Sequence, residues 1–114
     1  MRYIKDGKVA VVYSPFYGAG WSTWNREHSE ILMMHPLIAE AVHEWQSHLL
    51  SEHAYKNKLH FALDILGLGQ EDLFIEDITT LAIFWLNPGD KFMIEEYDGK
   101  ESVILFDQIH WTTA

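Results

Sequence analysis

The chain contains no cysteine, few basic residues and no long apolar run. The absence of cysteine excludes disulfides, thiolate nucleophiles and cysteine-ligated zinc or iron–sulfur sites. No apolar stretch approaches the roughly 20 residues that a membrane-spanning helix needs, and the first residues do not form a basic-then-apolar signal peptide. We therefore expect a soluble cytosolic protein that does not bind membranes.

Basic side chains are scarce, since 8 lysine and arginine residues stand against 17 aspartate and glutamate residues. The imbalance lies mostly in residues 71–114, which hold ten acidic and two basic side chains. A field of this sign repels phosphate backbones, so we expect no direct nucleic-acid binding. It attracts a basic surface on a partner protein, although a solvated acidic surface that keeps a small protein in solution explains the same charges.

Apolar and aromatic residues are abundant. A chain of 114 residues fits one domain, 1–114, and its 48% hydrophobic content, with 14% aromatic residues, can form a substantial core. The same surplus is compatible with a homo-oligomer, because a small domain has little interior in which to hide it. No internal repeat or linker divides the chain.

Two Asp-Gly pairs predict tight hairpins near the two ends of the chain. Asp6-Gly7 and Asp98-Gly99 each lie between β-rich runs, and a type I′ turn needs positive φ at both central positions. The nearly all-apolar run 8–13 is expected at the centre of its sheet. The predicted strands are 2–5, 8–13, 73–75, 80–86, 91–97, 101–106 and 109–112.

The middle of the chain has helical spacing from about Ser29. Pro36 suits the first position of a helix, and the apolar stripe that follows predicts an amphipathic helix over 36–51. A second apolar stripe spans 52–66, where Gly67 offers a left-handed cap, and the sequence leaves open whether these are two helices or one bent helix. We predict an α+β fold with a mainly antiparallel sheet, an N-terminal hairpin plus a C-terminal meander, and one or two helices packed on one face.

The segment 14–25 has neither helical nor strand periodicity, yet it carries four aromatic side chains. Its aromatic rings could stack on a base or anchor a partner, and Arg26 is the nearest cation for a phosphate. Anchoring of the two tryptophans in the core is the alternative. The candidate binding residues are Tyr17, Gly18, Gly20, Trp21, Trp24 and Arg26 in this segment, and Glu95, Glu96, Asp98 and Glu101 in the acidic hairpin.

Two blocks of sequence and the final four residues resemble a known group of proteins. The run Val11-Val12-Tyr13-Ser14-Pro15-Phe16-Tyr17-Gly18-Ala19-Gly20-Trp21-Ser22-Thr23-Trp24-Asn25, the run Glu95-Glu96-Tyr97-Asp98-Gly99-Lys100-Glu101-Ser102 and the final Trp111-Thr112-Thr113-Ala114 are similar to a family of small, mostly uncharacterised proteins encoded by bacteriophages and prophages. The resemblance implies a phage accessory protein acting in the cytoplasm of the bacterial host. By analogy, accessory proteins of this size often counter host defence.

The sequence gives little support for metal binding or catalysis. Glu44, His48 and Glu52 would share one face of a continuous helix and could hold a divalent ion, but residues four apart also form ordinary surface pairs. No serine lies in a Gly-x-Ser-x-Gly turn, and the glycine-rich run lacks the lysine of a P-loop. We therefore expect no metal, no cofactor and no catalytic residue.

Three functions remain open. The first is a non-enzymatic phage accessory protein that binds a host macromolecule, with an aromatic loop as anchor and an acidic C-terminal surface that attracts a basic partner. The second is a protein that binds or processes a small nucleotide-like ligand in a pocket lined by the same loop. The third is a virion or assembly component.

Overall fold

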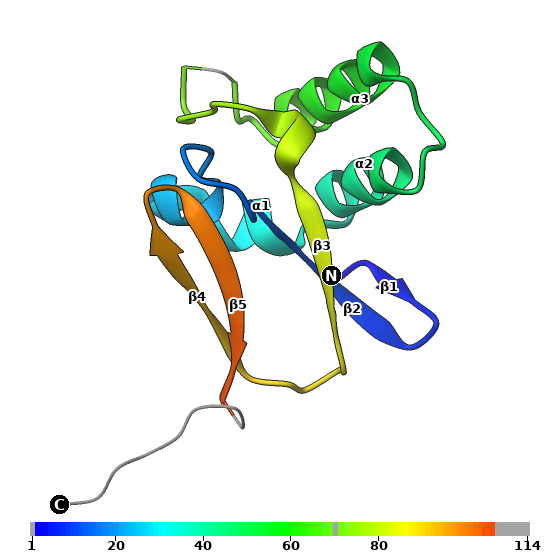
Figure 1. Ribbon diagram of the computed structural model, residues 1–114. Coiled ribbons are helices and arrows are strands. Elements are labelled where there is room, and N and C mark those ends of the chain that lie inside the picture. The colour runs from blue at the N-terminus through cyan, green and yellow to red at the C-terminus, as the bar shows by residue number, and fades with distance from the viewer. Residues whose placement is uncertain (1, 70, 107–114) are drawn as a thin grey trace, which may run out of the picture.

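The computed structural model describes residues 2–69 and 71–106 (Figure 1), and it confirms the predicted α+β fold with antiparallel pairing. None of the helices in these ranges is long and apolar enough to cross a membrane. The strands are β1 (Ile4–Lys5), β2 (Lys8–Tyr13), β3 (Ala82–Leu86), β4 (Phe92–Tyr97) and β5 (Lys100–Leu105). The helices are α1 (Ser29–Met34), α2 (Pro36–Gln46) and α3 (Glu52–Ile65), with short 3-10 turns η1 (Ser22–Trp24), η2 (Arg26–His28) and η3 (Ile78–Thr80).

The strands form two antiparallel sheets. The first has the order β1-β2-β3, so β2 is central as predicted, and the second is the hairpin β4-β5. Both Asp-Gly turns have positive φ at both positions, 51° and 75° at Asp6 and Gly7, and 51° and 84° at Asp98 and Gly99. The C-terminal strands differ in detail from a meander, because β3 pairs with β2 and not with β4.

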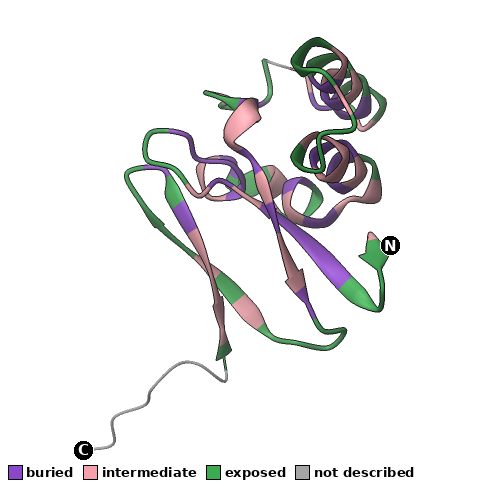
Figure 2. Cartoon of the chain, turned by 45° about the vertical axis from the view of Figure 1, so that its right-hand side comes forward, coloured by how far each residue is buried: buried purple, intermediate pink, exposed green. Residues whose placement is uncertain are grey.

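The first sheet is covered on both faces, which explains why β2 is apolar at nearly every position. One face carries Ala10, Val12 and Ile83, and these pack with the helices in the larger core cluster. The other face carries Val9 and Val11 and packs against the inner side of the β4-β5 hairpin. Figure 1 shows the hairpin and the pair α2 and α3 on opposite sides of β2 and β3, and Figure 2 shows β2 almost entirely buried.

The helical region consists of separate helices, which settles the question that the sequence left open. Pro36 begins α2 as predicted, with the His35 ring accepting from the Leu37 N–H at 3.2 Å. The helix ends at Gln46, and His48 takes a positive φ of 62° before Ser51 caps α3. At the end of α3, Gly67 has the positive φ expected of a left-handed cap.

One cation connects the two longer helices. The Lys58 ammonium of α3 pairs with Glu40 of α2 at 3.0 Å and also with Glu44. Partial burial opposes the charge on Lys58, but the hydrogen bonds that its ammonium donates to Glu44 and Glu40 outweigh this effect and raise the Lys58 pKa.

The predicted strand at 73–75 is wrong, and the one at 109–112 lies outside the described residues. No strand is assigned at 73–75, where Leu73 is buried and Phe74 is paired with a side chain. The Asn25 amide donates to the Phe74 carbonyl at 2.9 Å and accepts from its N–H. The Asn25 side chain thus satisfies the N–H and the C=O of Phe74. These two groups are therefore not available for hydrogen bonds to a neighbouring strand.

Candidate functional site

The Glu101 carboxylate joins the loop 14–25 to the β4-β5 hairpin. One carboxylate oxygen accepts from the Ser14 N–H at 3.0 Å, and the other accepts from the N–H groups of Trp21 and Thr23 at 3.0 Å each and from the Thr23 hydroxyl at 2.6 Å. The Glu101 N–H also donates to the Ser14 carbonyl at 2.6 Å. Because Glu101 is only 1% exposed, this residue holds the loop in place and is not available to a partner, which corrects the prediction that it belongs to a binding surface.

Trp21 is also internal. It is 1% exposed, and its indole N–H donates to the Leu32 carbonyl at 2.8 Å, so this ring is the core anchor that the sequence left as an alternative. Trp24 is half-buried and packs edge-to-face on Phe74, with the two ring centroids 5.1 Å apart. The prediction of an exposed Trp21 anchor is therefore wrong, because burial of this large ring stabilises the loop.

The glycines of the loop and of the hairpin turn allow a very close approach. A Cβ on Gly99 would lie 2.7 Å from the Ala19 nitrogen and 2.7 Å from the Trp24 ring, and one on Gly20 would overlap the same ring. The Gly18 N–H donates to the Asp98 carbonyl at 2.5 Å. The two sequence blocks, far apart along the chain, are thus packed backbone to backbone.

The exposed part of this assembly carries two tyrosines. Tyr17 and Tyr97 are 63% and 72% exposed, and their rings meet edge-to-face with centroids 6.2 Å apart. The Lys100 ammonium lies 5.3 Å from the Tyr17 ring centroid. Glu95 and Glu96 line the same shallow surface hollow as the two rings and Lys100, and the exposed Asp98 follows Tyr97 in the turn. We call these six residues the tyrosine–carboxylate patch.

The patch contains residues that the sequence singled out and two that it missed. Tyr17, Glu95, Glu96 and Asp98 were predicted; the structure places the first three in one surface hollow and leaves Asp98 exposed in the adjoining turn. Tyr97 and Lys100 were missed. The signal was present, since these two residues flank a two-residue turn and must therefore face each other in register.

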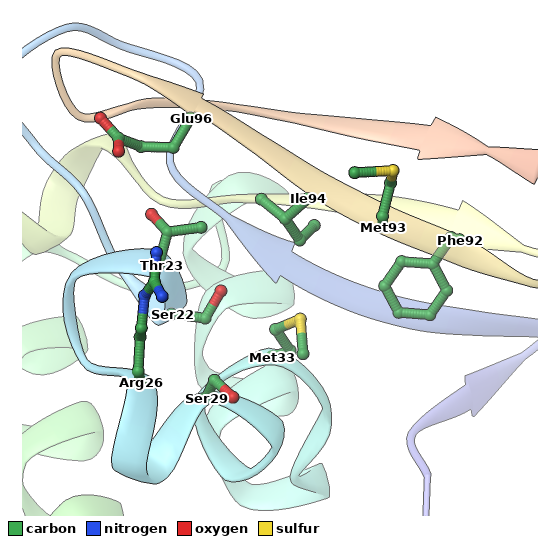
Figure 3. A pocket seen from close by; sticks show the side chains of 9 residues that line it. All are labelled: Ser22, Thr23, Arg26, Ser29, Met33, Phe92, Met93, Ile94 and Glu96. Atoms are coloured by element: carbon green, nitrogen blue, oxygen red, sulfur yellow. The ribbon is translucent and has the colours of Figure 1, made fainter. Parts of the chain in front are cut away.

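A separate groove lies between β4 and the segment from η1 to α1 (Figure 3). Its volume is about 450 Å³, and Met33, Phe92 and Ile94 form its apolar part. Arg26 enters it from η2, Glu96 borders it on β4, and Ser22, Thr23 and Ser29 add hydroxyl groups to the lining. The predicted residue Arg26 is exposed here, but the predicted aromatic rings of the loop are not part of this groove.

The candidate metal residues are not arranged as the sequence suggested. Glu44 lies on α2 and pairs with Lys58, whereas Glu52 opens α3 and pairs with Lys56 at 3.2 Å. His48 lies between the helices, so the three side chains share no helix face. In residues 2–69 and 71–106, no three His, Asp or Glu side chains are grouped so as to hold a metal ion.

No family model, curated protein or solved structure matches the chain.

Proposed function

We propose that this protein is a non-enzymatic binding protein that engages a basic surface of a macromolecular partner through the tyrosine–carboxylate patch. The observation that carries the proposal is the contact between Tyr17 and Tyr97, two large rings that remain mostly exposed although they are packed on each other. Exposed tyrosines with restricted motion lose little entropy on binding and are common in the energetically dominant part of interfaces.

The way in which the fold holds the patch in place favours a binding role. Tyr17 belongs to a loop whose backbone is fixed by Glu101 and by the Gly18–Asp98 hydrogen bond, so it is presented in one position before a partner arrives. Such preorganisation reduces the ordering cost of association. The carboxylates around the rings add attraction for a cationic partner and faster association.

The resemblance to phage-encoded proteins supports the biological setting of this proposal. It favours a host macromolecule in the bacterial cytoplasm as the partner, with counter-defence inhibition as the function by analogy. A virion or assembly component would use the same surface within a particle, and copurification with particles would distinguish that role.

A capture experiment tests the proposal. The double variant Tyr17→Ala, Tyr97→Ala removes the two exposed rings, and Phe61→Ala, Ile65→Ala is the matched control, because those side chains are 66% and 58% exposed on α3. From a bacterial host lysate, the unmodified protein and the control should retain a basic protein that the tyrosine variant loses. Equal capture by all three proteins would refute the role of the patch.

The nucleotide-like ligand is the weaker alternative. Arg26 and the hydroxyls of the groove could bind a phosphate, but Trp21 is internal and Tyr17 lies at another surface, so no ring of the loop provides a stacking surface there. A thermal shift with a nucleotide panel checks it, since a ligand at 100 times its Kd adds about 2.7 kcal/mol of stability.

A further inference from the structure

The outer edge of β4 borders the groove, and residues 2–69 and 71–106 provide no backbone hydrogen bond to it. In a hairpin with a two-residue turn, Tyr97 and Lys100 form a hydrogen-bonded pair, and bonded and non-bonded pairs then alternate along the strands. The Phe106 N–H donates to the Lys91 carbonyl at 3.0 Å, so Lys91 and Phe106 are a bonded pair, as this alternation requires. The N–H and C=O groups of Phe92, Ile94 and Glu96 therefore point away from β5.

The other strand edges are short or have at least one outward N–H group already paired. β1 has only two residues. On the outer edge of β3, the Ile83 N–H donates to the Gln46 side chain at 3.1 Å, and on β5 the Glu101 N–H donates to the Ser14 carbonyl. Within residues 2–69 and 71–106, no strand besides β5 pairs with β4. An open edge of this length is a template for a further strand.

The groove supplies side-chain sites beside this edge. A strand added to β4 turns every second side chain toward the inner face, where Met33, Phe92 and Ile94 provide apolar contacts. The opposite wall bears hydroxyls that can receive polar groups, and the end near the Asp98-Gly99 turn is acidic. Among the described residues at this end, the exposed carboxylates of Glu95, Glu96 and Asp98 outnumber the cations Arg26 and Lys100 by three to two, and Glu96 itself lines the groove.

We propose that the free edge of β4 binds an extended segment of a partner protein as a third strand. Main-chain hydrogen bonds to Phe92, Ile94 and Glu96 provide the affinity, and the groove selects apolar side chains at alternate positions. The carboxylates at the turn end select a lysine or arginine in the same segment. This inference rests on the proposed function and adds to it the conformation and composition of the partner segment.

A peptide selection tests the inference. The full chain is presented with a display library of random peptides of about twelve residues. In parallel, the library is presented with Ser29→Trp, which fills the groove, and with Ser29→Ala as the matched control. We expect enriched peptides with apolar residues at every second position and a lysine or arginine, and we expect them to bind Ser29→Ala but not Ser29→Trp. Thermal unfolding of both variants checks that the fold is kept.

Two measurements on a selected peptide complete the test. Adding it should slow amide exchange at Phe92, Ile94 and Glu96, and N-methylation of its alternate amides should weaken binding by at least about tenfold, because each methyl removes a main-chain donor. Acidic or helical peptides, or peptides indifferent to position 29, would overturn the inference. The inference would also be overturned if a nucleotide occupied the groove, or if the protein formed a dimer that Ser29→Trp abolished.

The inference and the proposed function fail in different ways. If the tyrosine variant loses its partner while no peptide depends on position 29, the patch binds and the edge does not. If peptides bind the edge while lysate capture is unaffected by the tyrosine variant, the proposed role of the patch is wrong.

Discussion

The Glu101 carboxylate accepts hydrogen bonds from four donors, three of them backbone N–H groups. Glu101→Gln should therefore destabilise the protein by about 3 kcal/mol or more, since an amide NH₂ in place of one oxygen leaves buried donors facing a donor, at about 1–3 kcal/mol for each unsatisfied group. Denaturant unfolding measures the loss. The control is Glu95→Gln at an exposed position of the same hairpin, for which we expect a change within about 0.5 kcal/mol. Equal effects would mean that Glu101 does not hold the loop.

Asp77, at the start of η3, makes a pH-dependent contribution to the stability of the folded protein. Its carboxylate accepts from the Thr79 hydroxyl at 2.6 Å and from the Thr79 N–H at 3.0 Å, and these bonds lower the Asp77 pKa. At neutral pH, Asp77→Ala should cost about 1 kcal/mol, as the loss of a cap typically does. Because the folded pKa is the lower one, this contribution is complete above the ordinary aspartate pKa and disappears as the pH falls through the folded value.

Urea unfolding at a series of acidic pH values follows this effect. The stability difference between the protein and Asp77→Ala should shrink toward zero in acid, whereas Glu76→Ala, an exposed neighbour, should show little difference at any pH. If the stability difference between the protein and Asp77→Ala stayed unchanged below the folded pKa of Asp77, the carboxylate charge would not be the source of the stabilisation.

At the scale of elements, the two Asp-Gly turns form a natural comparison. Gly7 and Gly99 both have positive φ, but a Cβ on Gly7 meets nothing within 4 Å, whereas one on Gly99 lies 2.7 Å from Ala19 and Trp24. Gly7→Ala should cost about 1–2 kcal/mol from the left-handed backbone alone. Gly99→Ala should cost at least about 1 kcal/mol more, because the packed loop must move. Thermal unfolding of the two variants compares them, and equal losses would show that the contact between loop and turn contributes little.

Local features of the fold were predictable, and long-range features were not. The Asp-Gly turns, the Pro36 helix start and the central position of β2 follow from residues adjacent in sequence. The pairing of β3 with β2, the separate β4-β5 sheet and the failed strand at 73–75 depend on contacts between distant segments.

The candidate site shows the same limit. Glu95 and Glu101 look alike in the sequence, yet the register of β4 and β5 and the loop above them leave one exposed and the other buried. Trp21 and Tyr17 are both aromatic residues of one loop, and only the tertiary fold decides which ring enters the core. The sequence singled out two segments that the fold packs together, but it could not assign which of their side chains point inward and which point outward.

At the scale of the whole molecule, stability should decrease from the centre outward. β2 lies between the helices on one face and the β4-β5 hairpin on the other, so the amides of Val11 and Val12 should exchange only on global unfolding. The hairpin packs with one face alone and should open at a lower free energy.

Native-state hydrogen exchange measured residue by residue tests this gradient and also the free edge of β4. Along β4, the amides of Met93 and Glu95 point to β5 and should be protected, whereas those of Ile94 and Glu96 point to the groove and should exchange quickly. Alternation with a period of two is the distinctive result. Uniform protection along β4 would mean that the outer edge is already paired in solution, because buried backbone donors exchange slowly only when they are bonded.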